Sequence, residues 1–121
     1  TYYRPENIKS EILRFMEEHN LTGNDIDLLL SGKSGDIKLD DDMSSLISET
    51  FPSTSVGLFK HLCGEYFTAT SFALWLTWSI LKNGKVPSIV LDIQHIESLK
   101  KILIYNRYLQ DHHSLLLVTK E

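Results

Sequence analysis

The segment Lys60–Leu76, KHLCGEYFTATSFALWL, decides the fold that the sequence predicts. A lysine and a short loop with Gly64 run directly into a stretch that is almost entirely apolar. The first N–H groups of a helix have no intrahelical partners and face outward. We therefore expect Lys60 and Glu65 to lie at the mouth of a buried helix.

The helix predicted over residues 67–82 has very little polar face, and Asn83-Gly84 is its stop signal. Helices that are apolar all round are normally covered on every side. A chain of 121 residues with few layers can hardly cover such a helix alone. We expect a second copy, another chain or a missing half to supply the covering layer. The apolar run is shorter than the ~20 residues that a bilayer needs, so no membrane span is predicted.

Apolar periodicity predicts the elements around this helix. We expect helices over residues 5–19 and 43–50, and strands over residues 26–30, 54–59, 102–105 and 114–118. Asp41 or Asp42 is expected to cap the second helix, and residues 106–113 are expected to form a polar turn. Alternating helices and strands are typical of an α/β sheet with helix layers. The Lys60–Glu65 loop then follows the C-terminal end of a strand.

Composition excludes several classes of function. The net charge of −4 gives no basic footprint, so nucleic acid is not an expected partner. Neither a zinc-like Cys/His spacing nor an EF-hand pattern around Asp40–Asp42 is present, so we expect no metal and no cofactor. His112 and His113 are adjacent, and on a strand they would point to opposite faces.

Cysteine usage and the start of the chain suggest the compartment. Cys63 is the only cysteine, which fits a reducing compartment, and no signal peptide is visible. We therefore expect a cytoplasmic protein. The chain starts at Thr1 without methionine, which suggests a processed chain or a fragment.

Two long segments carry a resemblance to a known family. Residues 59–90, FKHLCGEYFTATSFALWLTWSILKNGKVPSIV, resemble the lysine, glycine-containing loop, buried helix and VP turn of β-ketoacyl synthases. Residues 5–32, PENIKSEILRFMEEHNLTGNDIDLLLSG, resemble the helix and strand that precede the first histidine of that family. The resemblance implies that residues 1–121 form a single half domain, the C-terminal half of a thiolase-like α/β fold. A mixed sheet, a buried central helix and a C-terminal antiparallel strand pair are then expected.

The resemblance also implies a chemistry and partners. Family members condense an acyl thioester with a malonyl thioester, delivered on an acyl carrier protein, in fatty-acid or polyketide-type biosynthesis. Their nucleophilic cysteine belongs to the N-terminal half, and Cys63 does not occupy its place. Lys60 matches the family lysine, whereas the two family histidines fall at Ser31 and Glu65. The implied protein partner is a second copy or a complementary thiolase-like half.

Glu65 is the departure that matters most for the chemistry. The family histidine donates a hydrogen bond to a thioester oxygen as negative charge grows there. An ionised glutamate only accepts hydrogen bonds and would repel that charge. We therefore expect this chain alone to be inactive in condensation.

Other interpretations of these residues remain open. Lys60 can pair with Glu65 or with an acid of Asp40–Asp42, either as an inherited site pair or as a structural salt bridge. Cys63 and His61 are either packed loop residues or a nucleophile with its base. The parent protein is then a non-catalytic partner, an acyltransferase that uses Glu65 as a base, or a structural module without a ligand.

Overall fold

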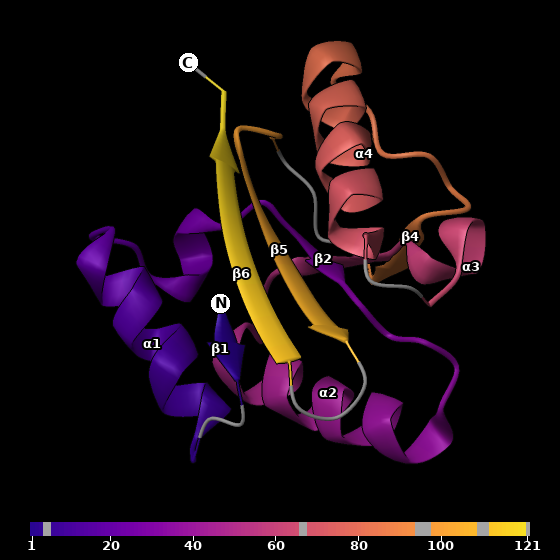
Figure 1. Ribbon diagram of the computed structural model, residues 1–121. Helices are drawn as coiled ribbons and strands as arrows, with labels where there is room; N and C mark the ends of the chain where they lie inside the picture. The colour runs from indigo at the N-terminus through magenta and orange to yellow at the C-terminus, as the bar shows by residue number, and fades with distance from the viewer. Residues whose placement is uncertain (4–5, 66–67, 94–97, 109–111, 121) are drawn as a thin grey trace.

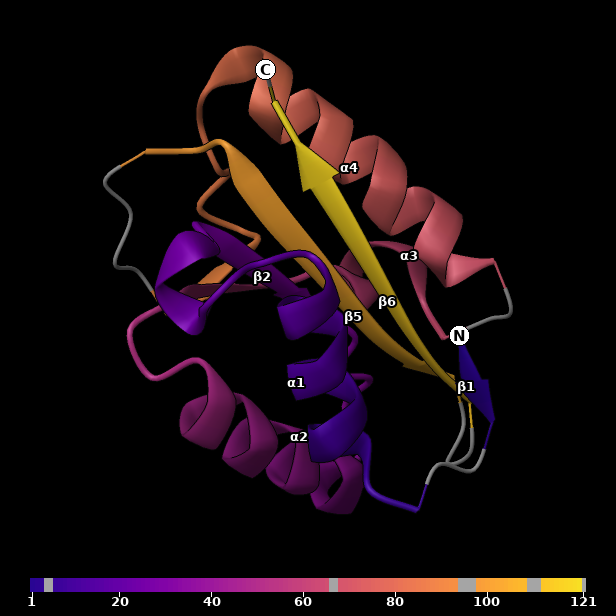
Figure 2. The same cartoon turned by 90° about the vertical axis from the view of Figure 1, so that its left-hand side faces the viewer.

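The protein is an α/β domain in which helices cover both faces of a mixed β-sheet (Figures 1 and 2). The computed structural model describes residues 1–3, 6–65, 68–93, 98–108 and 112–120. The strands are β1 (Tyr2–Tyr3), β2 (Leu28–Ser31), β3 (Ser55–Leu58), β4 (Leu91–Ile93), β5 (Lys101–Tyr108) and β6 (His112–Thr119). The helices are α1 (Ile8–Glu18), α2 (Ile37–Thr50), α3 (Lys60–Cys63) and α4 (Ala69–Asn83), with a 3₁₀ turn, η1, at Gly23–Asp25.

The strands are ordered β1-β6-β5-β2-β3-β4 across the sheet. The central strand β2 runs parallel to both of its neighbours, β3 and β5. The other pairs are antiparallel, including the closing pair of β5 and β6. All four residues of β2 are buried, as expected for a parallel strand covered by helices on both faces. The α/β class and the antiparallel C-terminal pair predicted from the sequence are confirmed.

Two separate apolar cores lie on the two faces of the sheet. Leu29 of β2 points to the side of α1 and α2, where it joins Ile12, Met43 and other buried residues. Leu28 and Leu30 point to the opposite side and pack with residues of α4. Successive side chains of a strand alternate between faces, so one short strand holds both cores together.

Helix α4 confirms the apolar helix of the sequence prediction, and Gly84 ends it in a left-handed conformation with φ of 71°. Its buried side chains face the sheet: Ala69, Ala73, Leu76, Thr77, Ile80 and Leu81. Its outer side carries large apolar side chains that remain exposed, foremost Trp75 and Trp78. Within the described residues, the helix is therefore buried on one side only.

Helix α2 begins six residues earlier than the sequence predicted, and the predicted cap was wrong. Asp36 is the N-cap, and its side chain accepts the N–H of Leu39 at 3.1 Å. Asp40 lies in the first turn and accepts the N–H groups of Ser34 and Gly35 at 3.0 and 2.9 Å. These bonds fold the loop back onto the helix start, so Asp41 and Asp42 lie inside the helix.

Several other boundaries differ from the prediction. Strands β5 and β6 extend into the predicted polar turn of residues 106–113, of which 109–111 lie outside the described residues. The short edge strands β1 and β4 carry too little pattern to be predicted, and residues 60–63 form one helical turn. Helix α1 starts at Ile8 with Asn7 as its cap, whereas the predicted start at Pro5 lies outside the described residues.

The two histidines of β6 point to opposite faces, as predicted. His112 is exposed, whereas His113 is buried and its Nδ1 lies 2.9 Å from the hydroxyl of Tyr105. Burial raises the pKa of the Tyr105 phenol from 10.0 to about 12, while the charge of Arg107 opposes part of that shift. Burial therefore favours the neutral form of Tyr105 in the folded state.

We predict that stability falls at alkaline pH because of Tyr105. A folded-state pKa above the unfolded value gives a contribution that is complete below about pH 10 and is lost as pH rises through about 12. The loss amounts to about 2–3 kcal/mol. Urea unfolding across this range should show a steeper decline for the wild type than for Tyr105→Phe. Equal declines would refute the assignment to Tyr105.

Candidate functional site

The C-terminal ends of three parallel strands meet at one edge of the sheet. The register pairs Ser31 of β2 with Leu58 of β3 and with Tyr105 of β5. Gly32 follows β2 directly, Lys60 lies two residues beyond the end of β3, and Arg107 is the last residue but one of β5. Ligands of α/β sheets bind outside the carboxyl ends of the strands, so this edge is the candidate site.

A buried ion pair lies at this edge. The Lys60 side chain is only 1% exposed, and its Nζ donates to Glu65 Oε2 at 2.6 Å. The same ammonium donates to the backbone carbonyl of Arg107 at 2.8 Å. Lys60 therefore connects the end of β3, the end of β5 and the loop before α4. The sequence left two kinds of partner open for Lys60, Glu65 and the acids of Asp40–Asp42, and in the structure the partner is Glu65.

The loop geometry explains why Glu65 reaches Lys60. The single turn of α3 ends at Gly64, whose N–H donates to the carbonyl of Lys60 at 2.6 Å. Gly64 has φ of 89°, a conformation that favours glycine, and it turns the chain back toward the sheet. The Glu65 side chain is 29% exposed, so solvent reaches one partner of the pair and not the other.

The arrangement restricts what Glu65 can do chemically. A buried ammonium needs a counter-charge and hydrogen-bond acceptors, and Glu65 supplies both. A carboxylate in such a pair has no proton to donate, so it cannot stabilise an oxyanion. Its remaining capacity is to accept a hydrogen bond or a proton.

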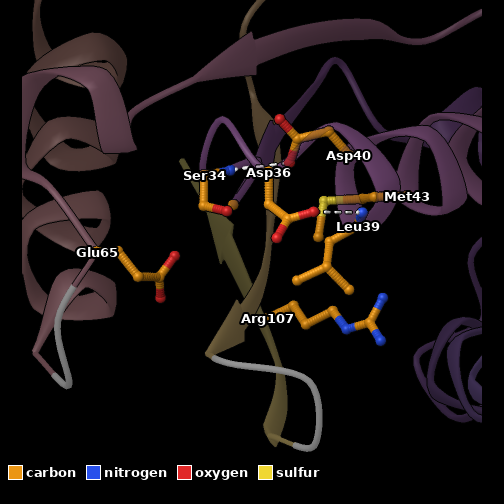
Figure 3. Close-up of a pocket in the computed structure, with 8 residues that line it drawn as sticks. Ser34, Asp36, Leu39, Asp40, Met43, Glu65 and Arg107 are labelled. Atoms are coloured by element: carbon orange, nitrogen blue, oxygen red, sulfur yellow. Dashed lines mark hydrogen bonds between the residues drawn. The ribbon is translucent and has the colours of Figure 1, made fainter.

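Glu65 also lines a cavity of about 180 Å³ between this loop and the start of α2 (Figure 3). Figure 3 shows Glu65 on one side of the cavity, with Asp36 and Asp40 on the facing segment. The lining residues are Gly32, Ser34, Asp36, Leu39, Asp40, Met43, Glu65 and Arg107. Each carboxylate oxygen of Asp40 accepts a backbone N–H group, whereas the hydrogen bonds recorded within the described residues engage only one oxygen each of Asp36 and Glu65.

The structure does not bring the other sequence candidates into this cavity. Ser31 is fully buried, and its hydroxyl donates to the sulfur of Met43 at 3.0 Å. His61 Nε2 lies 2.7 Å from the carbonyl of Ile89. Cys63 is half-buried against the core beneath α4. These contacts favour packing roles for His61 and Cys63.

Sequence reasoning missed Asn106, which it placed in a polar turn. Asn106 is 3% exposed, and its Nδ2 donates to Thr70 Oγ1 at 2.9 Å, which ties the end of β5 to the first turn of α4. Its Oδ1 is buried and has no hydrogen-bond partner among the residues that the structure describes. The sequence did contain a signal that Asn106 is buried, because this asparagine directly follows the apolar run ILIY at residues 102–105.

Gly32 shows how closely this edge is packed. A Cβ at position 32 would lie 2.4 Å from Asn106 Oδ1 and 3.0 Å from its Cα. A side chain there would collide with both the carboxamide and the backbone of β5. Glycine at this position is required by the close approach of two strands.

Gly32→Ala should destabilise the fold by about 1–3 kcal/mol because the added methyl group overpacks this contact. Chemical denaturation would measure the loss. The double variant Gly32→Ala/Asn106→Ala should cost less than the sum of the single variants, because removing the carboxamide opens space. Wild-type stability of Gly32→Ala would contradict the packing described.

The unequal burial of the ion pair predicts unequal mutational costs. Glu65→Gln leaves a buried ammonium without its counter-charge, whereas Lys60→Met leaves a carboxylate that water can reach. Glu65→Gln should therefore lower the free energy of unfolding by roughly 1–3 kcal/mol, and more than Lys60→Met does.

A matched control for this comparison is the exposed pair Lys9–Glu49, whose Glu49 side chain is 62% exposed. Glu49→Gln should cost less than about 1 kcal/mol. If Lys60→Met proved the more damaging substitution in denaturant titrations, the stated role of burial would be wrong.

Comparisons with known proteins give no match. No family model matches the sequence, and neither the curated proteins nor the solved structures contain a significant match. Within the described ranges, no group of three or more His, Cys, Asp or Glu side chains could hold a metal ion. None of the helices in the part of the chain that the structure describes has the length and apolarity to cross a membrane.

Proposed function

We propose that this chain is the C-terminal half of a β-ketoacyl synthase-like protein of fatty-acid or polyketide-type biosynthesis, and that it does not catalyse condensation alone. Three features support the thiolase-like assignment. The sheet is mixed and closes with an antiparallel pair, β5 and β6. The apolar helix α4 packs on one face of the sheet. Lys60 follows β3 directly and precedes that helix, in the order that the resemblance implies.

The Lys60–Glu65 ion pair is the observation that carries the inactive assignment. Condensation through a malonyl thioester needs a donor where the family has its second histidine. At that position Glu65 is bound to Lys60 at 2.6 Å. The ammonium is buried and already committed to two acceptors, Glu65 and the Arg107 carbonyl. It therefore does not substitute for the missing donor.

The first histidine position gives the same result. Ser31 is fully buried, and its hydroxyl faces Met43. It is outside the cavity that Glu65 lines. Cys63, the sole thiol, packs beneath α4 on the other face of the sheet from Met43. The nucleophile and both donors of the family reaction would have to come from elsewhere.

The proposed role is a non-catalytic partner in a synthase assembly. Such a partner holds one wall of a cleft in place while another chain supplies the reactive groups. Lys60 serves this role because it fastens the loop before α4 to the end of β5. The substrates implied for the assembly are acyl thioesters carried on an acyl carrier protein.

One alternative is favoured by a specific observation. Glu65 lines the cavity and retains an oxygen that Lys60 does not bind. That oxygen could accept a proton from an incoming hydroxyl or amine during acyl transfer. Glu65→Gln in the full-length protein tests this alternative, since unchanged acyl-transfer turnover would remove Glu65 from the mechanism.

A condensation assay tests the proposal. The chain is mixed with acyl- and malonyl-loaded carrier protein, and both carbon–carbon bond formation and release of CO₂ from the malonyl group are followed. We expect neither product, because the nucleophile and the oxyanion donor are missing. An active β-ketoacyl synthase serves as the positive control. Condensation product from the isolated chain would overturn the inactive assignment.

A further inference from the structure

Another cavity, of about 280 Å³, lies where β5 ends, β6 begins and α4 starts. It shares no lining residue with the cavity that Glu65 lines. In Figure 2 the start of α4 and the strand β1 lie toward the same end of β6. We call it the β5–β6 cavity, and the residues that decide its chemistry are Thr70, Asn106, Tyr108, His112, Ser114 and Leu116.

Strand pairing arranges the wall of this cavity in rows. Tyr3 of β1, His112 of β6 and Tyr108 of β5 lie side by side across the sheet. The next row pairs Ser114 of β6 with Asn106 of β5, and Asn106 bonds to the first turn of α4. Because residues two apart in a strand share a face, both rows lie on the side of the sheet that α4 covers.

The first row is a cluster of three aromatic rings. The centroid of the His112 ring lies 4.8 Å from that of Tyr3 and 6.3 Å from that of Tyr108. Both distances fall within the ~4.5–7 Å range of favourable ring pairs. His112 is exposed and Tyr3 is 61% exposed, so the row is open at the cavity. A planar ring bound in the cavity would extend this row.

The second row offers hydrogen bonds to the same ligand. Asn106 Nδ2 donates to Thr70 Oγ1 at 2.9 Å, so the Thr70 hydroxyl keeps its own proton for another acceptor. The Ser114 hydroxyl is half-buried and makes no hydrogen bond to a described residue. Hydroxyls need a partner once a ligand displaces their water. A purely apolar ligand would leave both without one.

Charge and size limit the ligand further. Among the described residues that line the cavity, none is an aspartate, glutamate, lysine or arginine. An ion would therefore lose water without a permanently charged side chain to replace it. A cavity of about 150 Å³ is enough for benzene, so the β5–β6 cavity has room for two fused rings.

We propose that the β5–β6 cavity binds a neutral planar aromatic ligand that carries a hydrogen-bonding group on its edge, such as a phenol. The ring packs against His112 and Tyr108, and the edge group bonds to the hydroxyls of Thr70 and Ser114. Leu116, which packs against the core under α4, supplies apolar contact. The proposal rests on this cavity alone and is independent of the function of the Lys60–Glu65 site.

Titration with 2-naphthol, followed through the backbone amide NMR resonances, tests the proposal. This ligand is a neutral phenol with two fused rings, and a ligand of its size in a matching site binds with a Kd of roughly 0.1–1 mM. We expect saturable shifts at Thr70, His112 and Ser114. Ser34 and Asp36, which line the other cavity, should not shift. Decahydro-2-naphthol, the saturated alcohol with the same skeleton, should bind at least ~3-fold more weakly because it cannot pair with the rings.

Two substitutions separate the contributions of the rows. His112→Leu removes the central ring and should weaken 2-naphthol binding at least ~3-fold. Ser114→Ala removes a hydroxyl and should weaken it roughly 3- to 10-fold. His19→Leu is the matched control, because His19 at the end of α1 is likewise exposed and its ring lies 4.5 Å from that of Phe15. That control should leave the Kd unchanged, and dispersed amide spectra should show that all three variants are folded.

Several outcomes would overturn the proposal. The absence of saturable shifts at ~2 mM 2-naphthol, above the expected Kd, would show that no such site exists. Equal binding of decahydro-2-naphthol would show that apolarity alone, without ring pairing, governs the cavity. Equal or tighter binding of the anion 2-naphthoate would assign the cavity to anions held by the amino group of Thr1 or by His112. Equal weakening by His112→Leu and His19→Leu would indicate non-specific binding. None of these outcomes changes the result expected in the condensation assay.

Discussion

Burial of β2 on both faces is the constraint on which the rest of the structure depends. Leu29 of this strand belongs to the core under α1 and α2, and Leu28 and Leu30 belong to the core under α4. Water cannot reach the backbone of a strand that helices cover on both sides, so all its N–H and C=O groups must form hydrogen bonds to neighbouring strands. Its parallel pairing with β3 and β5 supplies those hydrogen bonds. The same pairing sets the C-terminal ends of three strands side by side.

This shared edge explains the position of the buried ammonium. Lys60 follows β3 and finds the Arg107 carbonyl because β5 ends beside the same edge. Glu65 returns to it through the turn at Gly64. The ion pair is thus a consequence of strand alignment. A residue that secures the loop so firmly is a poor candidate for a group that must give up a proton.

The two faces of α4 have different physical roles. The inner face fills the core with small and branched side chains, Ala69, Ala73 and Ile80 among them. The outer face offers tryptophan rings to solvent. An isolated chain would expose this surface at a cost in free energy that association removes.

Patterns in the sequence determined the elements with strong periodicity: α1, α4, β2 and β3 lie near their predicted positions, and Lys60 and Glu65 were singled out together. Their local signals are apolar spacing and glycine stops, which act within a few residues. The start of α2 has a local cause, the Asp36 cap, which the sequence prediction placed too late in the chain. The strands β1 and β4 and the burial of Asn106 were decided only by tertiary structure, because residues distant in sequence pair with them. The choice of Glu65 over the Asp40–Asp42 acids was likewise tertiary, because it required the turn at Gly64 and the neighbouring end of β5. Contacts between residues far apart in the chain leave no periodic trace, so only the folded structure reveals them.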